Sequence, residues 1–536
     1  MNEYWNEALS EISDKHLEEA IQPKKKRTIR WIPAIAASLA AIIVAGALLP
    51  GMSQGKGEEG APTFPVFDQQ AQHQNPAEGI VPPVTKPTQS PAADPEKSDN
   101  TETTQPIDSI QPVSPILGLL SEPKYPDMPA YPNDAVNSSH NQDKFQAWQT
   151  ALKAQYDQPQ GYANSLTSFF TRSIPLFLGD SDENAVCSPL NIYMALSMLA
   201  ETTGGTSRAA VLSTLNAYNI ESLRAQAGHV WNAHYRSDGA SDCLLANSLW
   251  LNEGYLYNKD TVQTLADSYY ASVFQGDLGS PSMTNALRAW LSVQTQGLLD
   301  QYLEGIELSP NDALALASTV YFQAKWDSAF WDRQNTEGIF RGPAGKQTVT
   351  FMNQTLAYGP YYYGEDYGAV KLDLDDAGDH GKGAMWLILP DEGYTPADLL
   401  ESGYALDMVL GQEEWERSSS EIMVHLSMPK FDISAETDLE ASLTALGLGD
   451  LYSESSADFS SILPESVGAH LGKTTHAARV AVDEEGVTAA AYTVMMTAGA
   501  AIPPTEEVYF TLDRPFLFVI TSHDGLPLFT GVVNHP

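Results

Sequence analysis

The pattern of hydrophobic and polar residues changes near Gln142, where a proline-rich stretch gives way to periodic apolar segments. Two early segments, Tyr162–Leu178 and Ser188–Thr203, have helical spacing, and the second opens with Ser-Pro, which suits an N-cap and first turn. Strand-like patterns follow in Leu244–Asn252, Ala315–Trp326, Gly368–Asp375, Gly383–Asp391, Ile422–Ser434, Ala477–Glu485, Val508–Ser522 and Leu526–Val533. Early helices and late strands without regular alternation predict a mixed α+β domain over residues 141–536.

The stretch from Asp483 to Pro504 departs from this pattern. It follows the strand His476–Val482, is too long for a hairpin turn, and carries no charge from Val487 to Ala501. Small, β-compatible residues suit a strand, yet the stretch ends in Pro-Pro, which a central strand does not accept. As a strand, it has one face with no large or charged residue (Val487, Ala489, Ala491, Thr493) and one with its only aromatic (Thr488, Ala490, Tyr492, Val494). We therefore predict a strand kept outside the fold, with Gly486 as its hinge.

The N-terminal region has the features of a membrane anchor. Residues 31–50 form an uncharged apolar run of the length that crosses a bilayer core. The basic cluster Lys24–Arg30 before it predicts a cytoplasmic N-terminus and an exported remainder. We expect a cytoplasmic tail over 1–30, with a short amphipathic helix, and a single transmembrane helix over 31–50. A cleaved signal peptide is the alternative, in which case the domain is secreted.

Residues 51–140 contain 15 of the 34 prolines, many polar residues and few periodic apolar ones. This composition predicts a disordered, partly extended linker between the anchor and the domain.

The charge and the cysteines exclude several kinds of partner. A net charge of −39, all of it arising beyond residue 30, argues against nucleic acid or anionic lipid as a partner of the domain. Cys187 and Cys243 lie in apolar runs without CxxC spacing, so we expect two buried free thiols, with one disulfide as the alternative, and no zinc site. The acidic stretch Asp373–Gly381 suits a solvated turn better than a metal loop. We expect no metal, no cofactor and a monomer.

Nine motifs carry a resemblance to a known family. They are Ser188–Leu212 ("SPLNIYMALSMLAETTGGTSRAAVL"), Ala246–Asn252, Tyr321–Phe330 ("YFQAKWDSAF"), Val349–Gln354, Ala384–Gly393 ("AMWLILPDEG"), Leu426–Ile433, Asp483–Ala491 ("DEEGVTAAA"), Asp513–Ile520 ("DRPFLFVI") and Pro527–Val533. In this order and over residues 160–536, the chain resembles the serpins, the serine protease inhibitor family.

The resemblance implies the serpin fold, with three β-sheets, about nine helices and an exposed reactive-centre loop. In the family a target serine protease cleaves the loop and is held as a covalent acyl-enzyme while the loop inserts into the main sheet as a new strand. The hinge and the inserting residues would be Glu484, Gly486, Val487, Thr488, Ala489, Ala490 and Ala491. Val487 departs from the usual Thr or Ser, but it is uncharged and favours a strand.

The family's spacing places the cleaved bond at Ala500–Ala501, since fourteen residues usually separate it from the hinge glycine and Ile-Pro-Pro soon follows it. Alanine before the bond suits a protease with a small or shallow primary pocket, elastase-like or subtilisin-like, rather than a trypsin-like pocket that requires a cation. The nucleophile belongs to the target, so this chain needs no catalytic residue of its own.

The family's shutter beneath the main sheet corresponds to Ser188, Asn191, Ser318 and His476. The family usually has Ser where Asn191 stands and Asn where Ser318 stands. We hypothesise that the amide has changed sides and that Asn191 hydrogen-bonds toward His476.

The leading prediction is a membrane-anchored, surface-displayed bacterial inhibitor of secreted serine proteases. One alternative is a non-inhibitory binding or carrier protein on the same fold. Another is a surface sensor whose cytoplasmic tail signals, which residues 1–22 permit but do not demonstrate.

Overall fold

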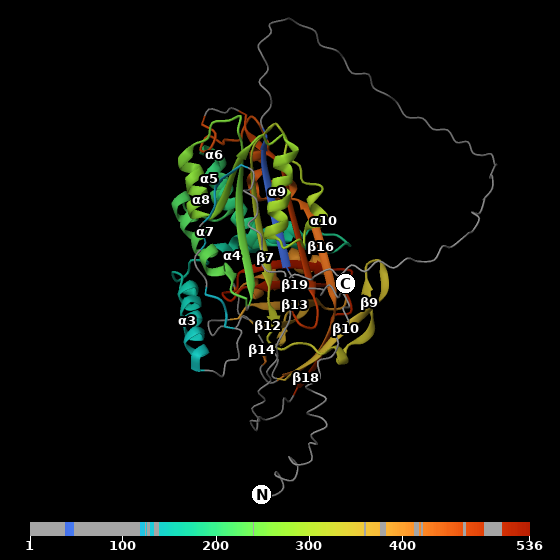
Figure 1. Cartoon of the computed structure of the whole chain (residues 1–536). Helices are drawn as coiled ribbons and strands as arrows, with labels where there is room; N and C mark the ends of the chain where they lie inside the picture. The colour runs from blue at the N-terminus through green and yellow to red at the C-terminus, as the bar shows by residue number, and fades with distance from the viewer. Residues whose placement is uncertain are drawn as a thin grey trace, which may run out of the picture. The chain divides into compact units, whose positions relative to one another are not determined.

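The chain forms a mixed α+β domain around three β-sheets, seen in a computed structural model (Figure 1). The structure describes residues 38–47 (backbone only), 118–123, 125, 129–132, 139–239, 241–357, 361–375, 382–411, 418–419, 422–464, 468–486 and 506–536. It confirms the predicted fold class: among these residues, two sheets have eight strands each and the third has four.

The main sheet has the strand order β16-β17-β1-β7-β5-β6-β2, with β4 paired to β5. Its strands are β1 Ser38–Ala47, β2 Leu119–Ser121, β4 Arg236–Ser237, β5 Asp242–Asn252, β6 Ala271–Gly276, β7 Asp312–Gln323, β16 Phe431–Asp438 and β17 His470–Val482. Central strand β7 is buried along nearly its whole length because both faces of the sheet are covered there.

The other two sheets complete the core. The second eight-stranded sheet contains β3 Ala185–Cys187, β8 Lys325–Trp326, β11 Tyr361–Tyr363, β12 Tyr367–Asp375, β13 Ala384–Pro390, β14 Ser418–Ser419, β19 Phe516–Thr521 and β20 Pro527–Val533. The four-stranded sheet contains β9 Thr336–Gly342, β10 Gly345–Ala357, β15 Ile422–Pro429 and β18 Glu506–Thr511. The stretch from Val487 to Thr505 thus joins a strand of the main sheet to a strand of the four-stranded sheet.

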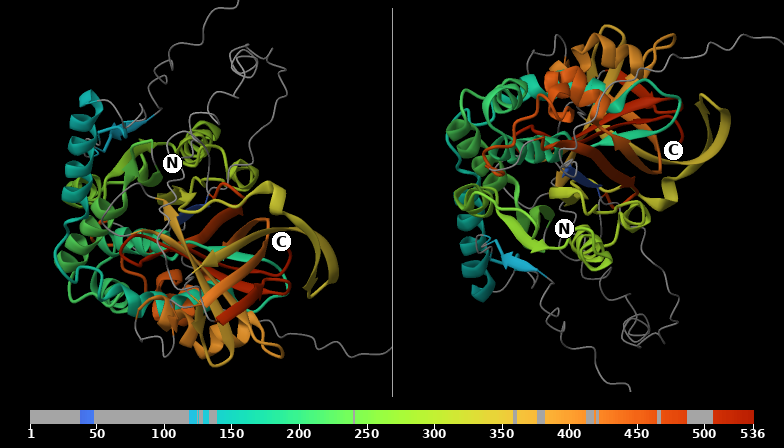
Figure 2. Two further views of the ribbon diagram at one scale, coloured as in Figure 1. Left: turned by 90° about the horizontal axis from the view of Figure 1, so that it is seen from below. Right: turned by 90° about the horizontal axis from the view of Figure 1, so that it is seen from above.

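The helices gather mainly on the side away from the four-stranded sheet, as the views from below and above show (Figure 2). They are α3 Ser139–Tyr156, α4 Leu166–Leu178, α5 Pro189–Thr202, α6 Gly205–Thr214, α7 Ile220–His234, α8 Lys259–Ser268, α9 Pro281–Gln294, α10 Asp300–Leu303, α11 Pro396–Ser402, α12 Tyr404–Val409 and α13 Glu440–Leu443. Every residue of α5 is buried, and Ser188 caps it as the sequence predicted, accepting a hydrogen bond from the backbone of Asn191.

The segment expected to cross a membrane has a different conformation in this structure. Ser38–Ala47 forms strand β1, which lies antiparallel between β7 and β17 (Figure 1). An apolar run of small and β-branched residues satisfies the requirements of a membrane helix and of a fully buried strand equally well, since both are apolar on all sides. Within the described residues, no helix is both long and apolar enough to span a bilayer.

Candidate functional site

In the main sheet, β1 lies between β7 and β17 and pairs with both of them, so these two strands do not pair with each other. We call this position the slot. Ile42 of β1 lies opposite Ser318 on β7 and His476 on β17, so those two residues mark the middle of the slot.

The four predicted shutter residues lie together beneath the slot, all buried. Ser188 donates its backbone N–H to Nε2 of His476 at 3.0 Å. Nδ2 of Asn191 donates to Oγ of Ser318 at 2.8 Å. The first turn of α5 therefore binds both strands that border the slot, one through a backbone group and the other through an amide.

The hypothesis that Asn191 hydrogen-bonds to His476 is wrong. The amide donates to Ser318 instead, and the backbone of Ser188 is the helix group that reaches the histidine. The physical reason is the helix cap: Ser188 precedes the first turn, so its N–H is free of intrahelical bonding and points toward β17.

The predicted hinge is the tight turn Asp483–Gly486, which follows β17. It pairs with β8, the short strand that comes after β7 in the chain. Gly486 forms antiparallel bridges with Asp483 and with Lys325 of β8. It has a φ of +96°, and a Cβ at this position would lie 2.3 Å from the backbone nitrogen of Trp326. Glycine is required here by conformation and by close approach of the backbone.

Glu484 is buried within the turn and has several partners. Its side chain pairs with Lys430 and accepts a hydrogen bond from Asn335, while its carbonyl accepts from the backbone of Phe330 at 2.9 Å. Burial opposes the charge, but Lys430 and Asn335 outweigh it, so the pKa of Glu484 is lowered. Trp326 closes the turn by donating its indole N–H to the carbonyl of Asp483 at 2.9 Å.

Asp483 has the opposite shift: burial, reinforced by the charges of Glu484 and Glu485, raises its pKa to about 6. Because the folded-state pKa exceeds the ordinary value of 3.8, the folded hinge binds the proton more tightly than the unfolded chain does. The resulting stabilisation is complete below about pH 4 and is lost as the pH rises through 6.

We therefore predict that Asp483→Asn raises the melting temperature at pH 7.5 and leaves it unchanged at pH 4. The gain in unfolding free energy should be about 1 kcal/mol, since solvent screening reduces the effect at a half-buried site. Asparagine keeps the side-chain oxygen that accepts the backbone N–H of Glu485. Calorimetry at both pH values checks this, with Asp267→Asn on the exposed face of α8 as the control. An equal difference at both pH values would contradict it.

The remaining predicted loop residues lie outside the described residues: Val487, Thr488, Ala489, Ala490, Ala491, Ala500 and Ala501. The sequence reasoning missed the residues that hold the hinge, namely Trp326, Asn335 and Lys430. Trp326 lies in a recognised motif, but its contact with a turn more than 150 residues away leaves no local signal.

The prediction about the cysteines is confirmed, since Cys187 and Cys243 are both free and buried. Burial raises the pKa of the Cys243 thiol to about 12 and that of Cys187 still further, so both are inert neutral thiols.

Known proteins share this architecture. The family model described as "Serpin (serine protease inhibitor)" matches residues 167–536. The human leukocyte elastase inhibitor is 28% identical over 386 residues, which cover 69% of this chain and 99% of that protein.

Two solved structures extend the similarity. The native state of tengpin, a thermophilic serpin, aligns with a TM-score of 0.60 at 24% identity and covers 71% of this chain and 95% of its own. Thyroxine-binding globulin in complex with thyroxine aligns with a TM-score of 0.55 at 21% identity, covering 72% and 99%. The family match extends over well more than half of the sequence and contains the hinge, the slot strands β7 and β17 and the shutter. This chain therefore belongs to the serpin family, the serine protease inhibitors.

Proposed function

We propose that the chain is a suicide inhibitor of secreted serine proteases with small primary pockets, elastase-like or subtilisin-like. The target's serine attacks the carbonyl carbon of Ala500, the amine of Ala501 leaves, and Ala500 remains esterified to the protease. Insertion of the loop into the slot then carries the acyl-enzyme away before water hydrolyses it.

The observation that carries this proposal is the register of the hinge. Gly486 forms antiparallel pairs with Asp483 and with Lys325. If this pairing continued, each residue after Gly486 would pair with a residue one position earlier in β17 and one position earlier in β7. Four residues on, Ala490 would lie between Arg479 and Tyr321. Leu39 of β1 lies between that same pair of residues. The loop and β1 would therefore fill the slot in the same direction and, along Leu39–Val44, in the same register, before the register of β1 shifts.

In this register, the loop is as long as the slot. Fourteen residues beyond Gly486, Ala500 would lie opposite Ala469 and Asn311, each directly before the first residue of its strand. The stretch from Val487 to Ala500 thus matches the full length of the slot. At about 3.4 Å per residue, full insertion would move the esterified residue by about 45 Å.

The register also assigns the two faces of the loop. Ala489 would lie opposite Val480 and Phe322, both buried, whereas Thr488 would lie opposite Ala481 and Gln323, both partly exposed. Residues opposite one another in a ladder share a face, so on insertion the face of the loop without large residues would be the one toward the core.

Only one segment can occupy the slot at a time, so the loop inserts only where β1 has left. We propose that residues 31–50 have two alternative conformations, a membrane helix that leaves the slot open and the strand that closes it. The anchored, extracellular form is then the active inhibitor, and the uncharged sequence of 31–50 supports the membrane conformation.

A binding or carrier function on the same fold is the main competitor, because thyroxine-binding globulin shares the fold. The two functions are distinguished by mixing the full chain, purified in detergent, with an elastase-like protease and looking for an adduct that survives denaturing gel electrophoresis. We expect the adduct, with its acyl group on Ala500. Cleavage at Ala500–Ala501 without an adduct would favour the carrier.

The identity of Ala500 should set the target. We predict that Ala500→Arg transfers inhibition to trypsin-like proteases, because their primary pocket pairs a buried acid with a basic side chain. Association rates with an elastase-like and a trypsin-like protease should change in opposite directions by at least about 100-fold, as several kcal/mol are involved. Ala500→Gly is the control, which should give no trypsin-like inhibition. Unchanged preference in Ala500→Arg would place the cleaved bond elsewhere.

A further inference from the structure

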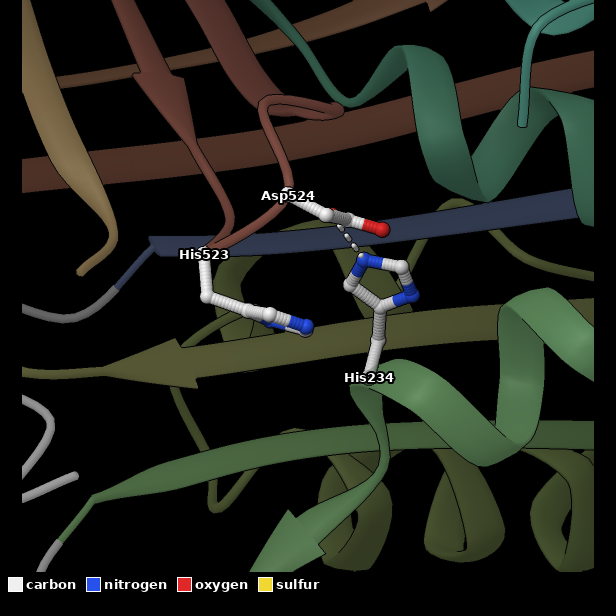
Figure 3. Close-up of side chains that lie close together, drawn as sticks. All are labelled: His234, His523 and Asp524. Carbon is white, nitrogen blue, oxygen red and sulfur yellow. Dashed lines mark hydrogen bonds and ion pairs between the residues drawn. The ribbon is translucent and has the colours of Figure 1, made fainter. Parts of the chain in front are cut away.

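A cluster of His234, His523 and Asp524 lies at the opposite end of α7 from its N-cap (Figure 3). His234 is the last residue of α7, and the other two belong to the turn between β19 and β20. One ligand atom from each side chain lies within 4.8 Å of the others. We propose that these three residues form a binding site for a divalent transition-metal ion, with zinc as the best fit.

The two nitrogens of His234 have separate roles. Nδ1 donates to the carbonyl oxygen of Val230 at 2.7 Å, and Nε2 faces Oδ1 of Asp524 at 2.9 Å. A hydrogen bond from one ring nitrogen to a backbone carbonyl is the usual way in which a metal-binding histidine is oriented, since it leaves the other nitrogen to bind the ion. Here the metal-binding nitrogen would be Nε2.

The other two ligands are also oriented by their neighbours. The hydroxyl of Tyr162 donates to Oδ2 of Asp524, while Oδ1 faces His234 and also accepts from the hydroxyl of Ser522 at 2.5 Å, a hydrogen bond that the ion would replace. The ring of His523 stacks on Tyr156, with ring centroids 3.8 Å apart and planes 19° from parallel. Tyr156 and Tyr162 lie just before the region that the family model matches, residues 167–536.

The chemistry of the three ligands suits zinc. Two imidazoles and a carboxylate are borderline ligands of the kind found in zinc sites with three protein ligands and one open position. Tetrahedral zinc with bonds of about 2.0–2.1 Å requires ligand atoms about 3.4 Å apart. Nε2 of His234 and Oδ1 of Asp524 are 2.9 Å apart, so these two atoms would separate by about 0.5 Å, and the partly exposed His523 would rotate to bring its nitrogen to the same distance from both.

There is also space for a fourth ligand. A cavity of about 40 Å³ adjoins the cluster, lined in part by His234, His523 and Ser522. This volume accommodates a water molecule, which would complete the coordination. The bound ion would then join the end of α7, which leads through β4 into the main sheet, to a turn of the second eight-stranded sheet.

The test uses the full chain without an affinity tag, freed of metal by chelation. We expect one Zn²⁺ bound per chain by calorimetry and, with Co²⁺ as the probe, the intense visible absorption of tetrahedral coordination. His523→Ala should weaken binding by at least about 100-fold, and Tyr162→Phe by about 10-fold, since partners of ligands typically contribute 10–100-fold. Zn²⁺ should also raise the melting temperature of the wild type but not of His523→Ala.

The matched control is His229→Ala, because His229 lies on the same helix and bonds to Gln158 instead of to the cluster. It should bind Zn²⁺ as the wild type does. His523 is partly exposed, so its replacement should leave the fold intact, which circular dichroism checks. Binding without 1:1 stoichiometry, or equal binding by the wild type and His523→Ala, would overturn the proposal. Neither result depends on protease inhibition.

Discussion

Replacing Ala489 by arginine is expected to convert the inhibitor into a substrate that the protease cleaves and releases. In the register that the hinge sets, this side chain would enter the core between Val480 and Phe322. Burying an unpaired guanidinium costs several kcal/mol, and each 1.4 kcal/mol changes a rate or equilibrium tenfold. Insertion should slow by about 100-fold or more, so hydrolysis of the acyl-enzyme would come first.

Thr488→Arg is the matched control, one residue away and on the opposite face. Its neighbours in the same register, Ala481 and Gln323, are partly exposed, so the arginine can extend into solvent. The measurement is the fraction of elastase-like protease trapped as a stable adduct at equal rates of loop cleavage. We expect near-complete trapping by Thr488→Arg and about 1% or less by Ala489→Arg. Equal trapping by both variants would contradict the assignment of faces.

Much of the fold could be predicted from the sequence because its signals are local. Strand-like segments rich in apolar residues identified most of the long strands, and Ser-Pro identified the start of α5. The sequence singled out Gly486, but the reason glycine is required there, a positive φ and the approach of the Trp326 backbone, appears only in the structure.

The parts that could not be predicted depend on contacts between distant residues. The partners of Glu484 come from β15–β16 and from the loop before β9, which no spacing near the hinge indicates. His234 and Asp524 are separated by 290 residues, so their pairing has no sequence motif. The exchange of Asn and Ser between positions 191 and 318 allowed the Asn191 amide to bond either to His476 or to Ser318. Only the structure shows that it bonds to Ser318.

The segment 31–50 shows a second reason why conformation could not be predicted from the sequence. Its composition fits a membrane helix and a buried strand equally well, and its environment decides between them. The loop also has a sequence of small apolar residues, so under the proposed mechanism one slot would accommodate either segment.

The second large expected effect is a rise in the melting temperature when the loop is cut. An inserted loop adds about a dozen backbone hydrogen bonds, and each contributes about 1 kcal/mol. For a domain of this size the entropy of unfolding is about 0.8 kcal/mol per degree, so the melting temperature should rise by about 10 °C or more after loop cleavage. In the Ile42→Pro chain we expect the full rise, because proline removes a ladder hydrogen bond from the middle of β1 and so favours a slot that is open to the loop. Ala93→Pro, in the linker, is the control.

The most direct test of the account is the melting temperature of the Ile42→Pro chain before and after its loop is cut. The cut is made with a metalloprotease, which forms no acyl-enzyme and so leaves no bound partner. If the loop fills the slot between β7 and β17, the cut chain melts about 10 °C or more above the intact one. An unchanged melting temperature in the fully cut chain would show that the loop does not insert, and the proposed inhibitory mechanism would be wrong.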